Sequence, residues 1–176
     1  DGQLITILDF EKIVAEIAPQ TTIQIKEVDE LGARRESKRP IWVAEDSLLL
    51  SKMIQESLSK ARYTNVRMFP NGAELWEALE EIEDAPDLLD QVALIITDLE
   101  MPQMDGHRLT KLVKSNEKLK KIPLIIFSSL ITEEMRRKGK EVGADEQLSK
   151  PEIGHLIGIV DHLLERSRRK REAGQA

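Results

Sequence analysis

Three short runs of this chain are apolar at nearly every position, and no other feature of the sequence limits the fold as strongly. They cover residues 41–44, 92–97 and 123–127. Uninterrupted apolar strands are typical of parallel sheets whose two faces are both covered by helices. Weaker strand patterns lie at residues 66–69 and 147–148, and an amphipathic helical pattern follows each strand. Five strand–helix units over residues 40–165 therefore predict an α/β fold with a doubly wound, five-stranded parallel sheet.

The composition excludes several classes of protein. The 176 residues, 40% of them apolar, suffice for one ordinary domain and a small additional element. Cysteine is absent, which excludes disulfides and thiolate chemistry, and no apolar run approaches the roughly 20 residues that span a bilayer. We therefore expect a cytoplasmic protein without membrane insertion. The net charge of −6 argues against a nucleic-acid partner, and we interpret the basic run 166–171 as a solvated helix end.

Charged or hydroxyl side chains stand at the carboxyl ends of the predicted strands. Glu45 and Asp46 follow the first apolar run, Asp98 follows the second, Ser128 ends the third, and Lys150 follows the weak last strand. Taken singly, each has an ordinary structural role as a helix cap, a turn residue or a surface lysine. Because parallel strands end along one rim, the set predicts a common site there.

The three carboxylates of this set predict either that one of them is protonated or that a cation lies between them. At about 4–5 Å, each ionised pair repels by roughly 3–4 kcal/mol at an effective dielectric near 20. Magnesium suits such a site, since it binds one or two carboxylates and leaves room for phosphate oxygens. Asp98 is then the candidate nucleophile that becomes an aspartyl phosphate, while Lys150 and Ser128 contact the phosphoryl oxygens.

The run Asp98-Leu99-Glu100-Met101-Pro102-Gln103-Met104-Asp105-Gly106 resembles the phosphoacceptor signature of response-regulator receiver domains. With the other strand-end residues, the resemblance covers residues 40–165. It implies a flavodoxin-like strand order 2-1-3-4-5 and phosphorylation of Asp98 by the phosphohistidine of a kinase. It also implies Mg2+ held by Asp46, Asp98 and the carbonyl of Glu100, with Glu45 acting through water. A cis peptide between Lys150 and Pro151 follows from the same resemblance.

The chain departs from the receiver pattern at several positions. Gln147 stands where receivers usually carry an aromatic switch residue, which puts coupling by an inward-swinging ring in doubt. Ser128 replaces the commoner threonine and keeps its hydroxyl. Residues 83–91 are the predicted insertion. By resemblance, Glu100 and Leu130 flank the path of hydrolytic water, and we hypothesise that they make decay of the phosphorylated state slow.

The first twenty residues resemble a different family. Residues 2–13 are similar to the closing strand and helix of CheW-like coupling domains. The predicted organisation is a CheW-like remnant at 1–20 as a strand–helix extension, a charged linker at 21–39, a receiver at 40–165 and a basic tail at 166–176. A coupling domain followed by a receiver is the arrangement of CheV-type chemotaxis proteins.

That arrangement implies a histidine kinase of the CheA type and chemoreceptors as partners, with phosphorylation tuning receptor–kinase coupling. We expect that the protein is not an enzyme but a signalling receiver that promotes its own phosphorylation and dephosphorylation. A pseudo-receiver that binds partners without phosphorylation is the alternative, and Gln147 favours it somewhat. A haloacid-dehalogenase-type phosphatase also uses a strand-end aspartate, but Glu100 stands where its second aspartate usually lies.

Overall fold

The computed structural model describes residues 34–174 apart from residues 130 and 151–152. Five strands make one sheet: β1 (Ile41–Ala44), β2 (Val66–Phe69), β3 (Leu94–Thr97), β4 (Leu124–Ser128) and β5 (Glu146–Ser149). The helices are α3 (Leu48–Lys60), α4 (Gly72–Ile82), α5 (Leu88–Gln91), α6 (Gly106–Ser115), the 3-10 turn η1 (Leu119–Lys121), α7 (Glu133–Glu141) and α8 (Ile153–Gly174). The predicted helix–strand alternation is confirmed.

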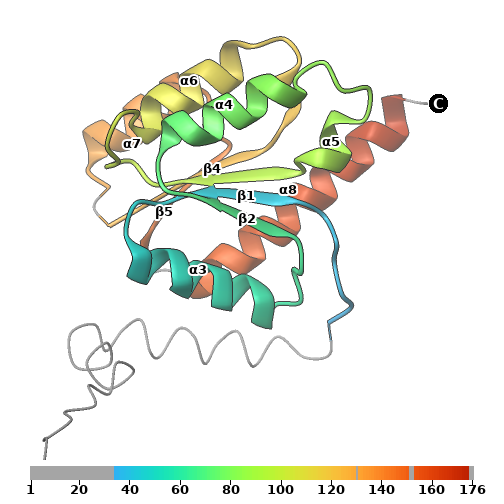
Figure 1. Ribbon diagram of the computed structural model, residues 1–176, viewed down its shortest axis with the longest axis horizontal. Helices are drawn as coiled ribbons and strands as arrows, with labels where there is room; N and C mark the ends of the chain where they lie inside the picture. The colour runs from blue at the N-terminus through green and yellow to red at the C-terminus, as the bar shows by residue number, and fades with distance from the viewer. Residues whose placement is uncertain (1–33, 130, 151–152, 175–176) are drawn as a thin grey trace, which may run out of the picture.

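The sheet is parallel throughout, with the order β2-β1-β3-β4-β5. This confirms the predicted doubly wound topology, and Figure 1 shows helices on both faces of the sheet. One apolar cluster packs α3 and α8 against the sheet, while a second fills the space under α4, α5 and α6. Alternate residues of one strand point to opposite faces, so Ile41 and Val43 join the first cluster and Trp42 and Ala44 join the second.

Side-chain caps mark the start of two helices. The Asn71 side chain accepts a hydrogen bond from the Glu74 amide at 2.9 Å and donates to its carboxylate at 3.1 Å. The Thr132 hydroxyl accepts from the Met135 amide. Because such bonds satisfy amide groups that the first helical turn leaves without partners, these local sequence patterns fix where α4 and α7 begin.

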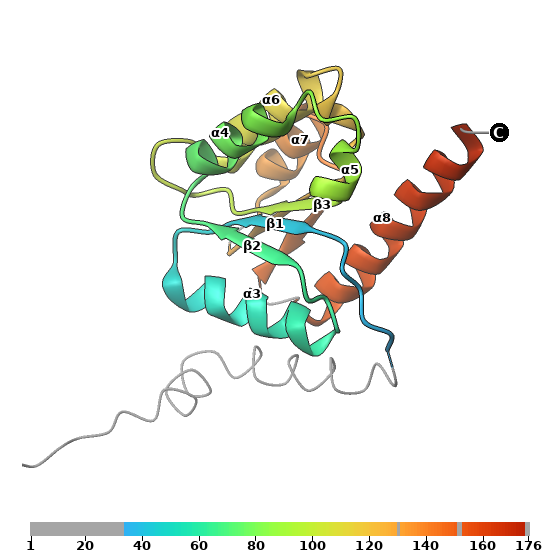
Figure 2. The same ribbon diagram turned by 45° about the vertical axis from the view of Figure 1, so that its right-hand side comes forward.

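Two segments differ from the expected layout. The 83–91 region contains a short helix of its own, α5, which packs Leu88 into the second apolar cluster. The basic run continues the same helix as the apolar stripe, since α8 extends to Gly174 and projects past the edge of the sheet (Figure 2). None of the helices within the described residues is both long and apolar enough to cross a membrane. The predicted coupling-domain remnant at 1–20 lies outside the described residues.

Candidate functional site

The carboxyl ends of three strands bring four of the predicted residues together at one rim of the sheet. Glu45 and Asp46 follow β1, Asp98 follows β3, and Lys150 follows β5. We call these four residues the acidic site. Glu45, Asp98 and Lys150 are buried, whereas Asp46 is exposed. The site is thus a buried ion cluster with one carboxylate open to water.

Lys150 is the cation of this cluster. Its ammonium nitrogen lies 2.7 Å from Asp98 Oδ2 and 2.9 Å from Glu45 Oε2. The side chain is only 7% exposed, so water contributes little to its solvation. A single buried lysine therefore joins residues that are far apart in the sequence, and it neutralises only part of the acidic charge around it.

The carboxylates of the acidic site fit a divalent cation. One oxygen each of Glu45, Asp46 and Asp98 lies within 4.8 Å of the other two. Glu45 Oε2 is buried, and its contact within the described part of the chain is the Lys150 ammonium at 2.9 Å, which lacks good hydrogen-bond geometry. Three ionised carboxylates and one ammonium sum to −2, which one magnesium ion would cancel. Hard oxygen donors and an open face at Asp46 are what Mg2+ requires.

Burial raises the pKa of the Glu45 carboxyl, and the Lys150 ammonium offsets only part of that rise. The negative charge of Asp98 adds to it. The other Glu45 oxygen accepts a hydrogen bond from the Ser47 amide at 3.1 Å, which holds the side chain over the rim. The direction of the pKa shift shows that burial of this carboxyl outweighs its contact with Lys150.

The backbone around Asp98 is held from two sides. The Leu99 amide donates to Asp98 Oδ1 at 2.7 Å, and the Thr97 hydroxyl donates to the Asp98 carbonyl at 2.9 Å. Gly106 lies so close that a Cβ built on it would be 2.0 Å from that carbonyl oxygen. The sequence motif contains Gly106 but does not indicate its role, and the sequence analysis did not identify Thr97 as part of the site. Both position the aspartate rather than react.

The remaining predicted site residues divide into two groups. Ser128 is buried at the end of β4, as expected for a hydroxyl that faces the rim. Glu100 is exposed in the loop after Leu99, and its proposed carbonyl contact to a metal stays a prediction. Leu130, and Pro151 with its expected cis peptide, lie outside the described residues. The hypothesis of slow hydrolysis therefore rests on the resemblance alone.

Gln147 lies against the backbone of α7. Its Nε2 donates to the Arg136 carbonyl at 2.9 Å, and within the described residues its Oε1 is buried without a partner. A Cβ at Gly139 would come within 2.2 Å of that oxygen, so glycine leaves the room that the amide occupies. This pairing of β5 with α7 could not be found from sequence, since no local pattern links a strand glutamine to a helical glycine.

Comparison with known proteins agrees with this geometry. Residues 41–161 match the response regulator receiver domain family, and the chain belongs to that family. It is 32% identical over 159 residues to the chemotaxis protein CheV2 of Helicobacter pylori. This alignment covers 87% of this chain and 47% of CheV2. The chain thus spans about half the length of this curated relative.

Solved structures show the same fold. The chemotaxis protein CheY4 of Vibrio cholerae superposes with a TM-score of 0.58 at 26% identity, over 72% of this chain and 99% of CheY4. A manganese-bound form of the response regulator Rcp1 gives a TM-score of 0.58 at 25% identity, over 72% of this chain and 95% of Rcp1. The predicted receiver fold is confirmed.

Proposed function

We propose that this protein is a phosphoacceptor receiver of chemotaxis signalling, in which Asp98 takes a phosphoryl group from the phosphohistidine of a CheA-type kinase. The observation that carries the proposal is the buried contact of Lys150 with Asp98, beside two further carboxylates that lie within 4.8 Å. Such a cluster is unfavourable until a cation compensates its excess negative charge, and a bound cation with Lys150 can then hold an anionic phosphoryl group. The similarity to CheV2 supports the assignment to chemotaxis.

The phosphoryl group passes directly from the kinase imidazole to Asp98. A carboxylate oxygen of Asp98 forms a bond to phosphorus as the bond between phosphorus and the kinase imidazole nitrogen breaks. The imidazole leaves with the electron pair of that bond and takes a proton from solvent. Lys150 and Ser128 bind phosphoryl oxygens, so this chain contributes mainly positioning and charge stabilisation.

Asp46, Asp98 and the Glu100 carbonyl would hold Mg2+, with Glu45 contributing through water. When bound, the ion supplies charge neutralisation for the phosphoryl oxygens. Before transfer, the exposed Asp46 leaves a path by which the ion and the phosphoryl donor reach the buried aspartate. Decay of the acyl phosphate regenerates the carboxylate and releases inorganic phosphate.

The proposed role of the whole protein also depends on the sequence upstream of the receiver. The resemblance of residues 2–13 to a CheW-like domain, and the match to about half of CheV2, support a coupling protein that connects chemoreceptors with the kinase. Phosphorylation of Asp98 would then tune that connection. The receiver supplies the phosphorylation-dependent part of this activity.

Incubation with acetyl phosphate and magnesium tests the proposal, with the intact protein mass as readout. The parent should gain one phosphoryl group, and Asp98→Asn should gain none. Asp105→Asn is the matched control, because Asp105 lies in the same loop and caps α6 through the Arg108 amide, a role that asparagine also fills. A parent that gains no mass, or an Asp98→Asn variant that still gains it, would contradict the proposal.

A further inference from the structure

Residues 34–39, part of the predicted charged linker, are fastened to the receiver. Ser37 forms an isolated parallel bridge with Tyr63: its amide donates to the Arg62 carbonyl at 2.8 Å, and its carbonyl accepts from the Thr64 amide at 3.1 Å. The segment runs directly into β1 and lies beside the chain that leads into β2. We call residues 34–39 the strap. It is a fixed part of the fold in the structure.

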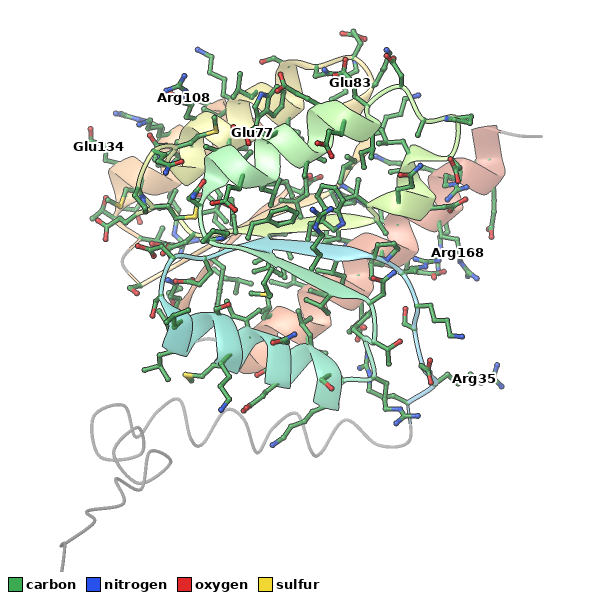
Figure 3. The ribbon with its side chains drawn as sticks, viewed as in Figure 1. Arg35, Glu77, Glu83, Arg108, Glu134 and Arg168 are labelled. Carbon is green, nitrogen blue, oxygen red and sulfur yellow. The ribbon has the colours of Figure 1, made fainter. Side chains whose placement is uncertain are left out.

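Arg34 holds the strap to α8. Its guanidinium donates to both carboxylate oxygens of Asp161, at 2.9 and 2.5 Å, and to the Ala61 carbonyl at 3.0 Å. The Tyr63 hydroxyl donates to the same carboxylate, and the guanidinium lies 5.9 Å from the centre of the Tyr63 ring. We call Arg34, Tyr63 and Asp161 the clasp. Arg35, which follows Arg34 in the sequence, points away from the domain (Figure 3).

The clasp has the properties of a specific contact. A bidentate arginine–carboxylate pair fixes direction as well as distance, unlike a lysine contact. The Arg34 and Asp161 side chains are 21% and 38% exposed, so the pair is partly shielded from water. Burial and the Asp161 carboxylate raise the pKa of the Tyr63 phenol, which keeps its proton available for donation.

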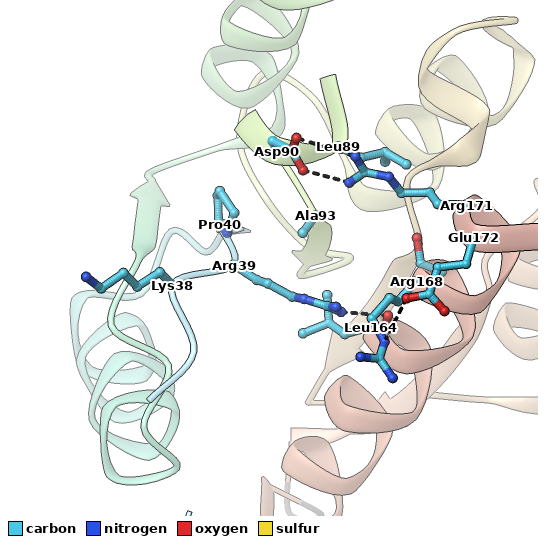
Figure 4. Close-up of a pocket in the computed structure, with 11 residues that line it drawn as sticks. Lys38, Arg39, Pro40, Leu89, Asp90, Ala93, Leu164, Arg168, Arg171 and Glu172 are labelled. Carbon is cyan, nitrogen blue, oxygen red and sulfur yellow. Dashed lines mark hydrogen bonds and ion pairs between the residues drawn. The ribbon is translucent and has the colours of Figure 1, made fainter. Parts of the chain in front are cut away.

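A second contact joins the strap to the same helix. The Arg39 guanidinium donates to the Leu164 carbonyl at 2.7 Å (Figure 4). Leu164 lies about one turn of α8 beyond Asp161. Both ends of the strap are therefore tied to α8, and a shift of this helix relative to β1 must change both contacts.

Helix α8 also begins next to the acidic site. It starts at Ile153, shortly after Lys150, and reaches Asp161 about two turns later, roughly 12 Å along its axis. Apolar side chains buried against the sheet hold the intervening turns as one rigid element: Leu156, Ile157 and Val160. Because α8 also contacts β5, the strand that precedes Lys150, a displacement there would be passed along the helix to the clasp.

We propose that the strap and the clasp report the phosphorylation state of Asp98, through α8, to the chain upstream of residue 34. The proposal rests on the function proposed above. In the structure Lys150 contacts both Asp98 and Glu45, and the clasp is closed. A phosphoryl group on Asp98 draws Lys150 to its oxygens, shifts the start of α8, and opens the clasp.

Amide hydrogen exchange of the 176-residue chain tests the proposal, with and without magnesium and beryllofluoride, a mimic of the acyl phosphate. The reporters are the Ser37 and Thr64 amides, whose acceptors lie within the strap pairing. Beryllofluoride should accelerate their exchange severalfold in the parent. In Asp161→Asn and in Arg34→Ala their exchange should be about tenfold faster from the start and no longer respond to the mimic. Arg34 lies outside the sheet, so its variant preserves the core.

Glu165→Gln is the matched control. Glu165 lies about one turn beyond Asp161 on α8 and pairs with Arg168 and Arg169, not with the strap. This variant should keep both the parental exchange rates and their response. Parental strap amides that ignore beryllofluoride while the Leu99 amide responds would overturn this inference alone. If the Leu99 amide also ignores it, the proposed phosphorylation of Asp98 fails as well.

Discussion

The acidic site lies close to the start of α8, and the clasp includes Asp161 of the same helix. The charges of these two ion clusters are balanced differently. In the clasp one carboxylate meets one guanidinium and one phenol, and both of its oxygens accept hydrogen bonds. In the acidic site three carboxylates share one ammonium, which lies close to both Glu45 and Asp98. The difference shows that the charges of the clasp balance among its own residues, whereas the acidic site has an excess of negative charge that a bound cation would balance.

The largest expected effect is the loss of the one cation in the acidic site. Lys150→Met leaves buried carboxylates uncompensated and should lower the free energy of unfolding by about 3 kcal/mol at pH 7 without magnesium. Urea denaturation measures it. Lys52→Met is the control, because Lys52 makes an exposed contact to Glu56 at 3.9 Å and should change stability by less than about 0.5 kcal/mol. Equal losses in both variants would mean that the acidic site is as tolerant as the surface.

Magnesium should stabilise the acidic site and leave the clasp unchanged. A ligand that binds only the folded state adds about 2.7 kcal/mol at one hundred times its Kd. Thermal unfolding with added magnesium should show this gain in the parent and in Tyr63→Phe. Asp46→Asn should lose most of it, because the exposed carboxylate is a proposed ligand. A full gain in Asp46→Asn would place the ion elsewhere.

The clasp should respond to loss of a single hydroxyl. Tyr63→Phe removes the donor to Asp161 but keeps the buried ring, and we expect a cost of about 1 kcal/mol. Chemical denaturation measures it, and addition of magnesium should not restore it. No loss in this variant would show that Arg34 alone satisfies the carboxylate, which would weaken the comparison between the two clusters.

The smallest effect concerns the pH dependence of Glu45. Because its pKa is raised above the ordinary value of 4.5, the folded state binds this proton more tightly than the unfolded state. The resulting stability is present below the ordinary value and is lost as pH rises through the folded pKa. Glu45→Gln should therefore raise the Tm by about 2 °C at pH 7 without magnesium, and the gain should vanish near pH 4. A gain that persists in acid would exclude titration of Glu45 as its cause.

Local patterns were sufficient for much of this protein. Apolar runs predicted β1, β3 and β4, and the Asn71 and Thr132 caps act locally too, because capping depends on atoms three residues apart. The basic run 166–171 was interpreted as a helix end, and the structure extends that helix to Gly174. Its charged residues pair one turn apart, as Glu165 does with Arg168 and Arg169, which lets a polar stretch remain helical.

The strap shows where composition misleads. A segment rich in charge predicts a solvated linker, and nothing near Arg34 in the sequence indicates its partner. Asp161 lies 127 positions away, so only the packing of α8 against α3 and the sheet brings the pair together. The same holds for Gln147 and Gly139, whose contact depends on how α7 lies over β5.

The sequence by itself determined the parallel sheet and the rim at which the acidic residues gather, because strand pattern and strand direction fix where strand ends meet. Only the tertiary structure decided which charges are satisfied. Ion pairs over long sequence separations depend on distances of a few ångströms between packed elements, and no periodicity in the chain encodes those distances.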